Sequence, residues 1–105
     1  MNKKAAFAIG QVIHHRLFDY RGVIFDVDAE FKGSEEWYEN NTKTGAPPRD
    51  EPWYHVLIDD DGRVAYVAQR NLESDMSDDP VDHPLLDSFF VGYQDGHYQA
   101  RHSIN

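Results

Sequence analysis

Short runs of β-branched and aromatic residues, separated by turn residues, constrain the fold more than any other feature of the sequence. Four such runs are Gln11–His14, Gly22–Asp28, Trp53–Ile58 and Val64–Ala68. A fifth short strand is expected to begin at Asn71-Leu72, after one tight helical turn at Gln69-Arg70. No long helical segment separates the runs, so they do not suit a parallel sheet with crossover helices. The pattern favours a mainly β fold, a small and strongly bent antiparallel barrel.

Two of these runs suggest how the sheet forms. Within Gly22–Asp28, strict alternation would place Val23, Phe25 and Val27 on one face. The run Trp53–Ile58 is the most apolar and is expected to be the central strand.

Turn signals define the connections between the runs. The Asp61-Gly62 pair predicts a tight hairpin, because glycine tolerates the positive φ that the turn requires. Residues 29–52 form a long connection, and such loops are usually functional or mobile. We expect one short helix in it, Ser34–Asn40, capped by the Ser34 side chain. Two prolines in Ala46–Arg49 then return the chain to an extended path.

Composition limits the classes of protein to which the chain can belong. Its 105 residues fit one domain, and the absence of cysteine excludes disulfides, thiolate catalysis and cysteine-based metal sites. No segment suits a membrane span or a signal peptide, so we expect a cytoplasmic protein without a membrane partner. The net charge of −9 repels nucleic acid at long range.

The acidic residues are concentrated in the C-terminal part. Residues 73–105 hold seven Asp or Glu against one Arg, a net charge of −6. We therefore expect a barrel domain over residues 1–86, with its insertion at 29–52, and an acidic, aromatic-containing tail over 87–105 that is a candidate for disorder. The apolar Phe89–Val91 cluster leaves three alternatives open: docking on the barrel, a subunit contact or partner binding.

An ordered set of segments resembles a known family. The set comprises Phe7–Val12, His15-Arg16, Tyr20–Asp28, Pro52–Leu57, Ala65–Val67, Asn71-Leu72 and His83-Pro84. Together they resemble the HspQ family, the YccV-like hemimethylated-DNA-binding proteins, over about residues 7–86. The resemblance implies an SH3-like five-stranded antiparallel barrel with a short helical insertion after the second strand.

The same resemblance implies two activities and no catalytic residue. One is regulation of ATP-dependent proteolysis in the stress response, in which the partners are the protease or its substrates. The other is binding of hemimethylated DNA. It also suggests homo-oligomers.

Candidate chemical motifs in the sequence are weak. A metal site would have to bring together three distant histidines, His15, His55 and His83. Asp59–Gly62 resembles a calcium loop but lacks its distal glutamate, so a solvated hairpin tip is the better interpretation. Asp26 and Asp28 could pair for acid–base chemistry, yet they have no evident positioned partner. We assign no catalytic residue, metal or cofactor, and a small enzyme is only the third hypothesis.

Aromatic and basic residues are the candidates for binding. The chain has more aromatic side chains than one small core can hold, so some are expected at an interface. The partner-binding candidates are Trp37, Tyr38, Trp53 and Tyr54. The alternative is that Trp37 and Tyr38 clamp the insertion onto the barrel. For DNA, the candidate contacts are dispersed along the chain: Arg16, Arg21, Arg49 and Arg63.

Overall fold

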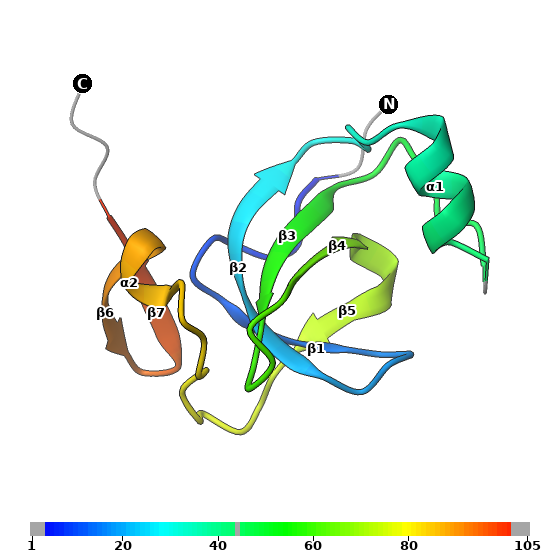
Figure 1. Cartoon of the computed structure of the whole chain (residues 1–105). Helices are drawn as coiled ribbons and strands as arrows, with labels where there is room; N and C mark the ends of the chain where they lie inside the picture. Colours follow the sequence, from blue (N-terminus) through cyan, green and yellow to red (C-terminus); the bar gives the residue numbers. More distant parts are fainter. Residues whose placement is uncertain (1–3, 44, 102–105) are drawn as a thin grey trace.

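The computed structural model describes residues 4–43 and 45–101, and its architecture is mainly β (Figure 1). Five strands form one antiparallel sheet in the order β4-β3-β2-β1-β5. Their bounds are β1 Val12–His15, β2 Arg21–Asp28, β3 Trp53–Ile58, β4 Val64–Ala68 and β5 Leu72–Ser74. The prediction of a mainly β fold with a five-stranded antiparallel sheet is confirmed.

The described strands do not close into a barrel by pairing. β4 and β5 are the two edges of the sheet, and the 3-10 turn η1 (Gln69–Asn71) leads from one edge to the other. The closed barrel expected from the sequence is therefore not confirmed. The middle strand is β2, while β3 lies between β2 and β4. Placing Trp53–Ile58 at the centre was wrong by one strand.

A β-bulge interrupts β2. The pairing register with β3 shifts between Ile24 and Asp26, so Phe25 is the extra residue. One extra residue reverses the alternation of side chains beyond it. Val23 and Phe25 consequently pack in one apolar cluster, while Ile24 and Val27 pack in another. The expected common face of Val23, Phe25 and Val27 is wrong for this reason.

Apolar side chains are buried on both faces of the sheet. One cluster draws on all five strands, with the buried residues Ile13, Ile24, Tyr54, Val56, Val67 and Leu72. The other joins the sheet to the C-terminal part, with the buried residues Val12, Val23, Leu57, Val81, Phe90 and Tyr98. A five-stranded sheet of this size therefore needs a second layer to cover its outer face.

The second layer is a C-terminal hairpin. It consists of the short helix α2 (Leu86–Phe89) and the paired strands β6 (Phe90–Gln94) and β7 (His97–Ala100). Of the three alternatives for the apolar cluster near Phe89, docking on the sheet is the one observed. Residues 86–100, which include most of the predicted tail, form α2, β6 and β7, and the last four residues of that tail lie outside the described residues.

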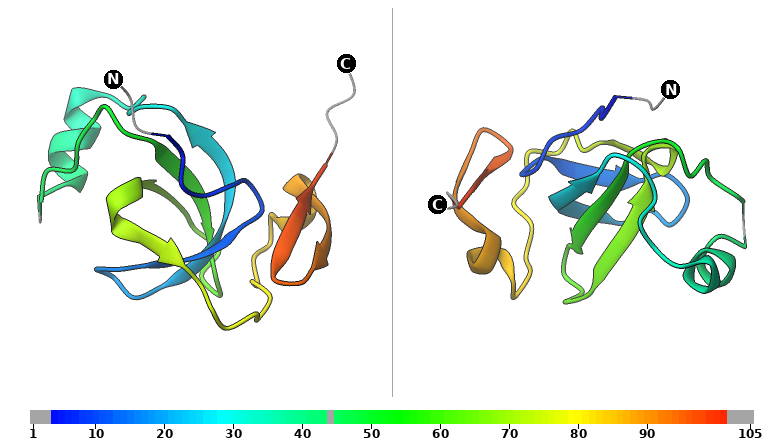
Figure 2. Two further views of the ribbon diagram at one scale, coloured as in Figure 1. Left: turned by 180° about the vertical axis from the view of Figure 1, so that it is seen from behind. Right: turned by 90° about the horizontal axis from the view of Figure 1, so that it is seen from above.

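The insertion carries the helix α1 (Glu35–Asn41). Ser34 caps it as predicted, since its Oγ accepts a hydrogen bond from the backbone N–H of Trp37 at 3.0 Å. The helix and the C-terminal hairpin lie at opposite ends of the molecule (Figures 1 and 2). Within the described ranges, no helix has the length and apolar character needed to cross a bilayer.

Candidate partner-binding groove

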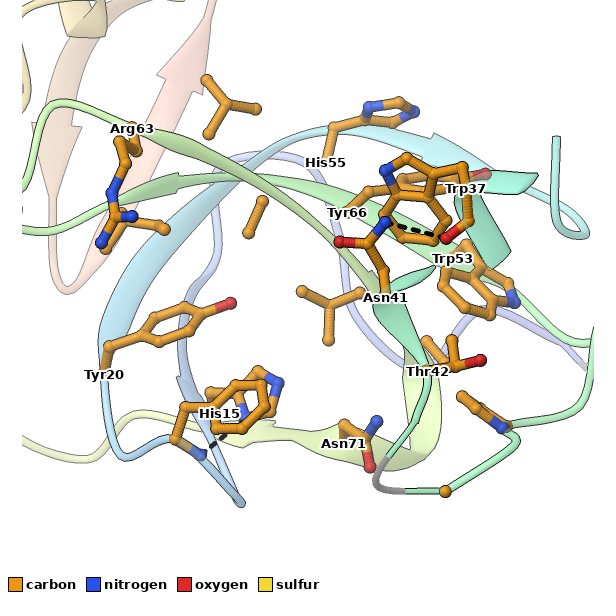
Figure 3. Close-up of a pocket in the computed structure, with 18 of the residues that line it drawn as sticks. His15, Tyr20, Trp37, Asn41, Thr42, Trp53, His55, Arg63, Tyr66 and Asn71 are labelled. Carbon is orange, nitrogen blue, oxygen red and sulfur yellow. Dashed lines mark hydrogen bonds between the residues drawn. The ribbon is translucent and has the colours of Figure 1, made fainter. Parts of the chain in front are cut away.

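A groove of about 740 Å³ lies along β4 (Figure 3). It is bounded by β4, by the turn that joins β1 to β2, by η1 and by the end of α1. Five aromatic side chains, from these segments and from β3, line it: Phe18, Tyr20, Trp37, Trp53 and Tyr66. Segments distant in sequence thus form one concave surface, which the sequence did not predict.

The groove carries little net charge. Of the described residues that line it, Asp61 and Arg63 are the only ones with side chains that are permanently charged at neutral pH. They pair with each other, with Arg63 Nε 2.5 Å from Asp61 Oδ1. A ligand here would meet aromatic rings and hydrogen-bonding groups rather than a strong local charge.

The turn between β1 and β2 presents apolar side chains to solvent at one wall of the groove. Leu17 is 58% exposed and Phe18 is 63% exposed. Sequence reasoning missed both residues. The available signal was two adjacent large apolar residues inside a connection between strands, where polar residues are usual.

Buried His15 shapes this turn. Its Nδ1 accepts the backbone N–H groups of both Leu17 and Phe18 at 3.1 Å, and the Phe18 ring stacks on the imidazole at 4.6 Å. Burial, with a smaller effect from His14, lowers the pKa of His15. The neutral ring is the form that can accept these bonds at Nδ1, so the exposed turn depends on an uncharged His15.

Three of the four aromatic residues predicted to bind a partner are buried, which corrects the expectation that they lie at the surface. Trp53 and Tyr54 are fully enclosed, and Tyr38 is 9% exposed. The Tyr38 hydroxyl donates to the carbonyl of Pro47 at 2.6 Å, and Trp53 Nε1 donates to the carbonyl of Pro48 at 3.1 Å. Both polar groups therefore keep a hydrogen-bond partner inside the protein, which offsets the cost of burying them.

Trp37 is the partly exposed member of the four. Its ring packs edge-on against Tyr66 and Trp53, with centroids 5.5 Å and 6.0 Å apart. The aromatic cluster therefore clamps the insertion onto β3 and β4, which is the alternative left open by the sequence. Trp37 also lines the groove, so one side of its ring is available to a ligand.

The predicted DNA-binding arginines are dispersed, and three of them are engaged by carboxylates. Arg21 pairs with Asp59 and Asp75 at 2.8 and 3.1 Å. Arg49 makes two hydrogen bonds to Glu35, and its guanidinium lies 3.9 Å from the centre of the Tyr38 ring. Arg63 pairs with Asp61, as described above.

Arg16 differs from these three. It is exposed, and its Nε donates to the backbone carbonyl of Leu72 at 3.2 Å. No carboxylate lies within ion-pair distance of it among the described residues. The structure thus leaves one of the four arginines with an uncompensated charge, at the same turn as Leu17 and Phe18.

The loop after β3 uses its carboxylates within the fold. Asp59 Oδ1 accepts the backbone N–H of Asp82 at 2.7 Å, while its Oδ2 binds Arg21. Partial burial opposes ionisation of Asp75, but hydrogen bonds from Ser77 and Arg21 outweigh it and lower the pKa of Asp75. These contacts tie the loop to the segment after β5, and Asp59 and Asp61 are not arranged as a calcium loop.

The histidines considered for metal binding do not converge. His15 contacts its own turn, and His83 Nε2 lies 2.9 Å from the carbonyl of Arg63. His14 points to the opposite side of β1 from His15, as expected, and contacts Asp19 at 2.6 Å. In the part of the chain that the structure describes, no three potential metal ligands gather.

Asp28 connects two rings beside the groove. The Tyr66 hydroxyl donates to Asp28 Oδ2 at 2.7 Å, and His55 Nε2 lies 3.0 Å from the same oxygen. Burial tends to raise the pKa of Asp28, but the bonds from Tyr66 and His55 lower it overall. Burial and the Asp28 carboxylate raise the pKa of Tyr66 well above its usual range. Tyr66 therefore stays protonated at neutral pH and fixes the wall of the groove.

A comparison with protein-family models assigns most of the chain to a family. The family described as "Hemimethylated DNA-binding protein YccV like" matches residues 5–97. The matched range contains the whole five-stranded sheet, the insertion with α1, and α2 and β6 of the C-terminal hairpin.

Proposed function

The chain belongs to the YccV-like family of hemimethylated DNA-binding proteins, and from this premise we propose that it is a non-enzymatic binding protein. We propose that it serves in the cytoplasm as a specificity factor for ATP-dependent proteolysis, binding substrates or the protease itself. The role in proteolysis rests on the resemblance to the HspQ family. The observation that carries the choice of a protein ligand is the aromatic groove beside the exposed Leu17-Phe18 turn.

The physical argument concerns what such a surface can bind. Exposed apolar residues at the rim of a concave aromatic surface gain free energy when a partner covers them, at about 25 cal/mol per Å². The net charge of −9 adds attraction for basic polypeptide and repulsion for anionic ligands. A polypeptide partner uses both features.

We also propose that the sheet is an SH3-like barrel. The strand order β4-β3-β2-β1-β5 and the single 3-10 turn between β4 and β5 support this assignment. In such a barrel the gap between the edge strands is a natural place for a ligand, and the groove lies beside one of them.

Binding of hemimethylated DNA is the second candidate function. The family description favours it, and exposed Arg16 supplies a cation beside the groove. The ion pairs of Arg21, Arg49 and Arg63 weaken it, because each phosphate contact would have to displace a carboxylate.

A degradation assay tests the proteolytic role. The rate at which a purified ATP-dependent protease degrades an unfolded substrate is measured with and without this protein. We expect Phe18→Ser to abolish the change in rate. Val91→Ser is the matched control, since Val91 is 59% exposed on the C-terminal hairpin and does not line the groove. Equal effects of the two substitutions, or no effect of the wild type, would contradict the proposal.

Fluorescence anisotropy tests the DNA role. Labelled hemimethylated and unmethylated duplexes are titrated with the protein at ~150 mM salt. Tighter binding of the hemimethylated duplex that is lost in Arg16→Glu would establish the second candidate in place of the first. Equal, weak binding that vanishes as salt rises would remove it.

A further inference from the structure

The residues that line the groove reveal which part of β4 it follows. All five consecutive residues of β4, 64–68, line it. Successive side chains of a strand point to opposite faces, so a hollow on one face would be lined by alternate residues only. A groove in contact with every residue runs along the edge of the strand.

The pairing of β4 with β3 shows which backbone groups face this edge. Ile58 N–H donates to the carbonyl of Arg63 at 3.1 Å, and Gln69 N–H donates to the carbonyl of Pro52 at 3.0 Å. Both bonds fit the register of the β3–β4 ladder, in which hydrogen-bonded and non-bonded pairs alternate. The backbone groups directed away from β3 therefore belong to Val64, Tyr66 and Ala68.

The outward groups of Val64 and Tyr66 have no strand beside them in the described part of the chain, because β4 is an edge of the sheet, whereas Ala68 is buried where the chain enters η1. We propose that the groove binds an extended, basic polypeptide segment that pairs with β4 as an additional strand. This proposal rests on the proposed function, since it identifies the form in which a protein partner is bound. The segment would pair along Val64–Tyr66, the part of β4 that is not buried, over about three residues or ~10 Å at ~3.4 Å per residue.

The charges select this occupant over the alternatives. The molecule carries a net charge of −9, while the charged pair in the groove, Asp61 and Arg63, is internally neutralised. A segment with lysine or arginine at alternate positions gains from the overall field. A second copy of the chain would bring another −9, and a DNA backbone would meet no free cation within the described lining of the groove.

Side chains beside the edge would give the segment its preference for apolar residues. Trp37 and Tyr66 form one wall, and Phe18 stands on the other. The side chains of an added strand alternate between the two faces of the sheet. One set would therefore pack on these rings while the other set, carrying the positive charges, stays in solvent.

A binding experiment with a defined peptide tests the inference without any protease. The probe is a peptide of about nine residues that alternates lysine and valine, so that it exceeds the length of β4. Trp37 and Trp53 are the two tryptophans of the chain and both line the groove, so their fluorescence reports binding. We expect saturable binding, and at least about tenfold weaker binding when glutamate replaces lysine.

Two modifications test the backbone pairing itself. N-methylation of the central peptide residues keeps the side chains and charges but removes the N–H groups, and we expect it to abolish binding. Val64→Pro removes one outward N–H of β4 without touching the β3 ladder, whereas Val64→Ala keeps it. We expect Val64→Pro to weaken binding and Val64→Ala to preserve it.

The outcomes separate this inference from the proposed function. Undiminished binding of the N-methylated peptide by the wild-type protein overturns strand addition, even if Val64→Pro fails to fold. Hydrogen exchange at the outward amides of Val64 and Tyr66 identifies other partners of this edge. If these amides become protected when the protein self-associates, or when DNA alone is added, the edge binds a second copy or DNA instead. Peptide binding at β4 together with an unchanged degradation rate would contradict the proteolytic role only.

Discussion

The contact between Gly10 and the C-terminal hairpin supports a quantitative prediction. Gly10 has a φ of +92°, and a Cβ atom placed on it would lie 2.0 Å from the carbonyl oxygen of Tyr98. The carbonyl of Gly10 also accepts the backbone N–H of Tyr98 at 2.7 Å. Gly62 has a similar φ of +85° with nothing within 4 Å of the corresponding Cβ position, so it is a matched control.

The structure gives the magnitude for each substitution. Alanine at a positive φ costs about 1–2 kcal/mol, which is the whole expected effect of Gly62→Ala. Gly10→Ala adds the loss of the Tyr98 hydrogen bond, about 1 kcal/mol. It also displaces apolar surface around Tyr98 and Phe90, for about 1–2 kcal/mol more. We therefore expect about 3–5 kcal/mol of destabilisation for Gly10→Ala.

Two measurements check this difference. Urea unfolding followed by tryptophan fluorescence gives the free energy of unfolding for both variants. Hydrogen exchange at the Tyr98 amide reports whether the hairpin leaves the sheet before the rest of the fold opens. Equal destabilisation by Gly10→Ala and Gly62→Ala, with the Tyr98 amide still protected, would refute the role assigned to this contact.

Two further predictions concern the turn and the insertion. The pKa of His15 is lowered in the folded state from its ordinary value of 6.5, so the unfolded state takes up the proton more readily as pH falls below 6.5. The stabilisation that neutral His15 gives the fold is therefore present above pH 6.5 and is lost on acidification. His14, whose pKa is raised by its hydrogen bonds to Asp19 and Glu73, acts in the opposite direction. Urea midpoints between pH 7.5 and 5 should therefore fall less with acidification in His15→Asn than in the wild type, and parallel profiles would exclude this role. Tyr38→Phe should cost about 1–3 kcal/mol, because it leaves the carbonyl of Pro47 unpaired inside the insertion, and an unchanged unfolding midpoint would show that this bond contributes nothing.

Local patterns predicted the elements that depend on local physics. The bounds of β3 and β4 were predicted to the residue, and α1 begins after its Ser34 cap as expected. Apolar runs, a glycine at a required positive φ and a side-chain cap act over a few residues. The family could likewise be recognised from an ordered set of such segments.

Features set by distant contacts could not be predicted in the same way. The bulge at Phe25 depends on the register with β3, and the burial of Trp53 depends on the insertion folding back over it. Arg21 finds Asp59 and Asp75, which lie 38 and 54 positions away in sequence. The groove is also of this kind, because no single segment contains more than one of its walls.

The covering of the outer face by the C-terminal hairpin has a consequence for how the protein is made. All five strands of the sheet precede residue 75, so they can pair while later residues are still being translated. Val12, Val23 and Leu57 would remain exposed to solvent on the nascent chain until residues 90–98 emerge and cover them. During that interval the partly folded chain would expose the apolar outer face of its sheet, which is the kind of surface that chaperones bind.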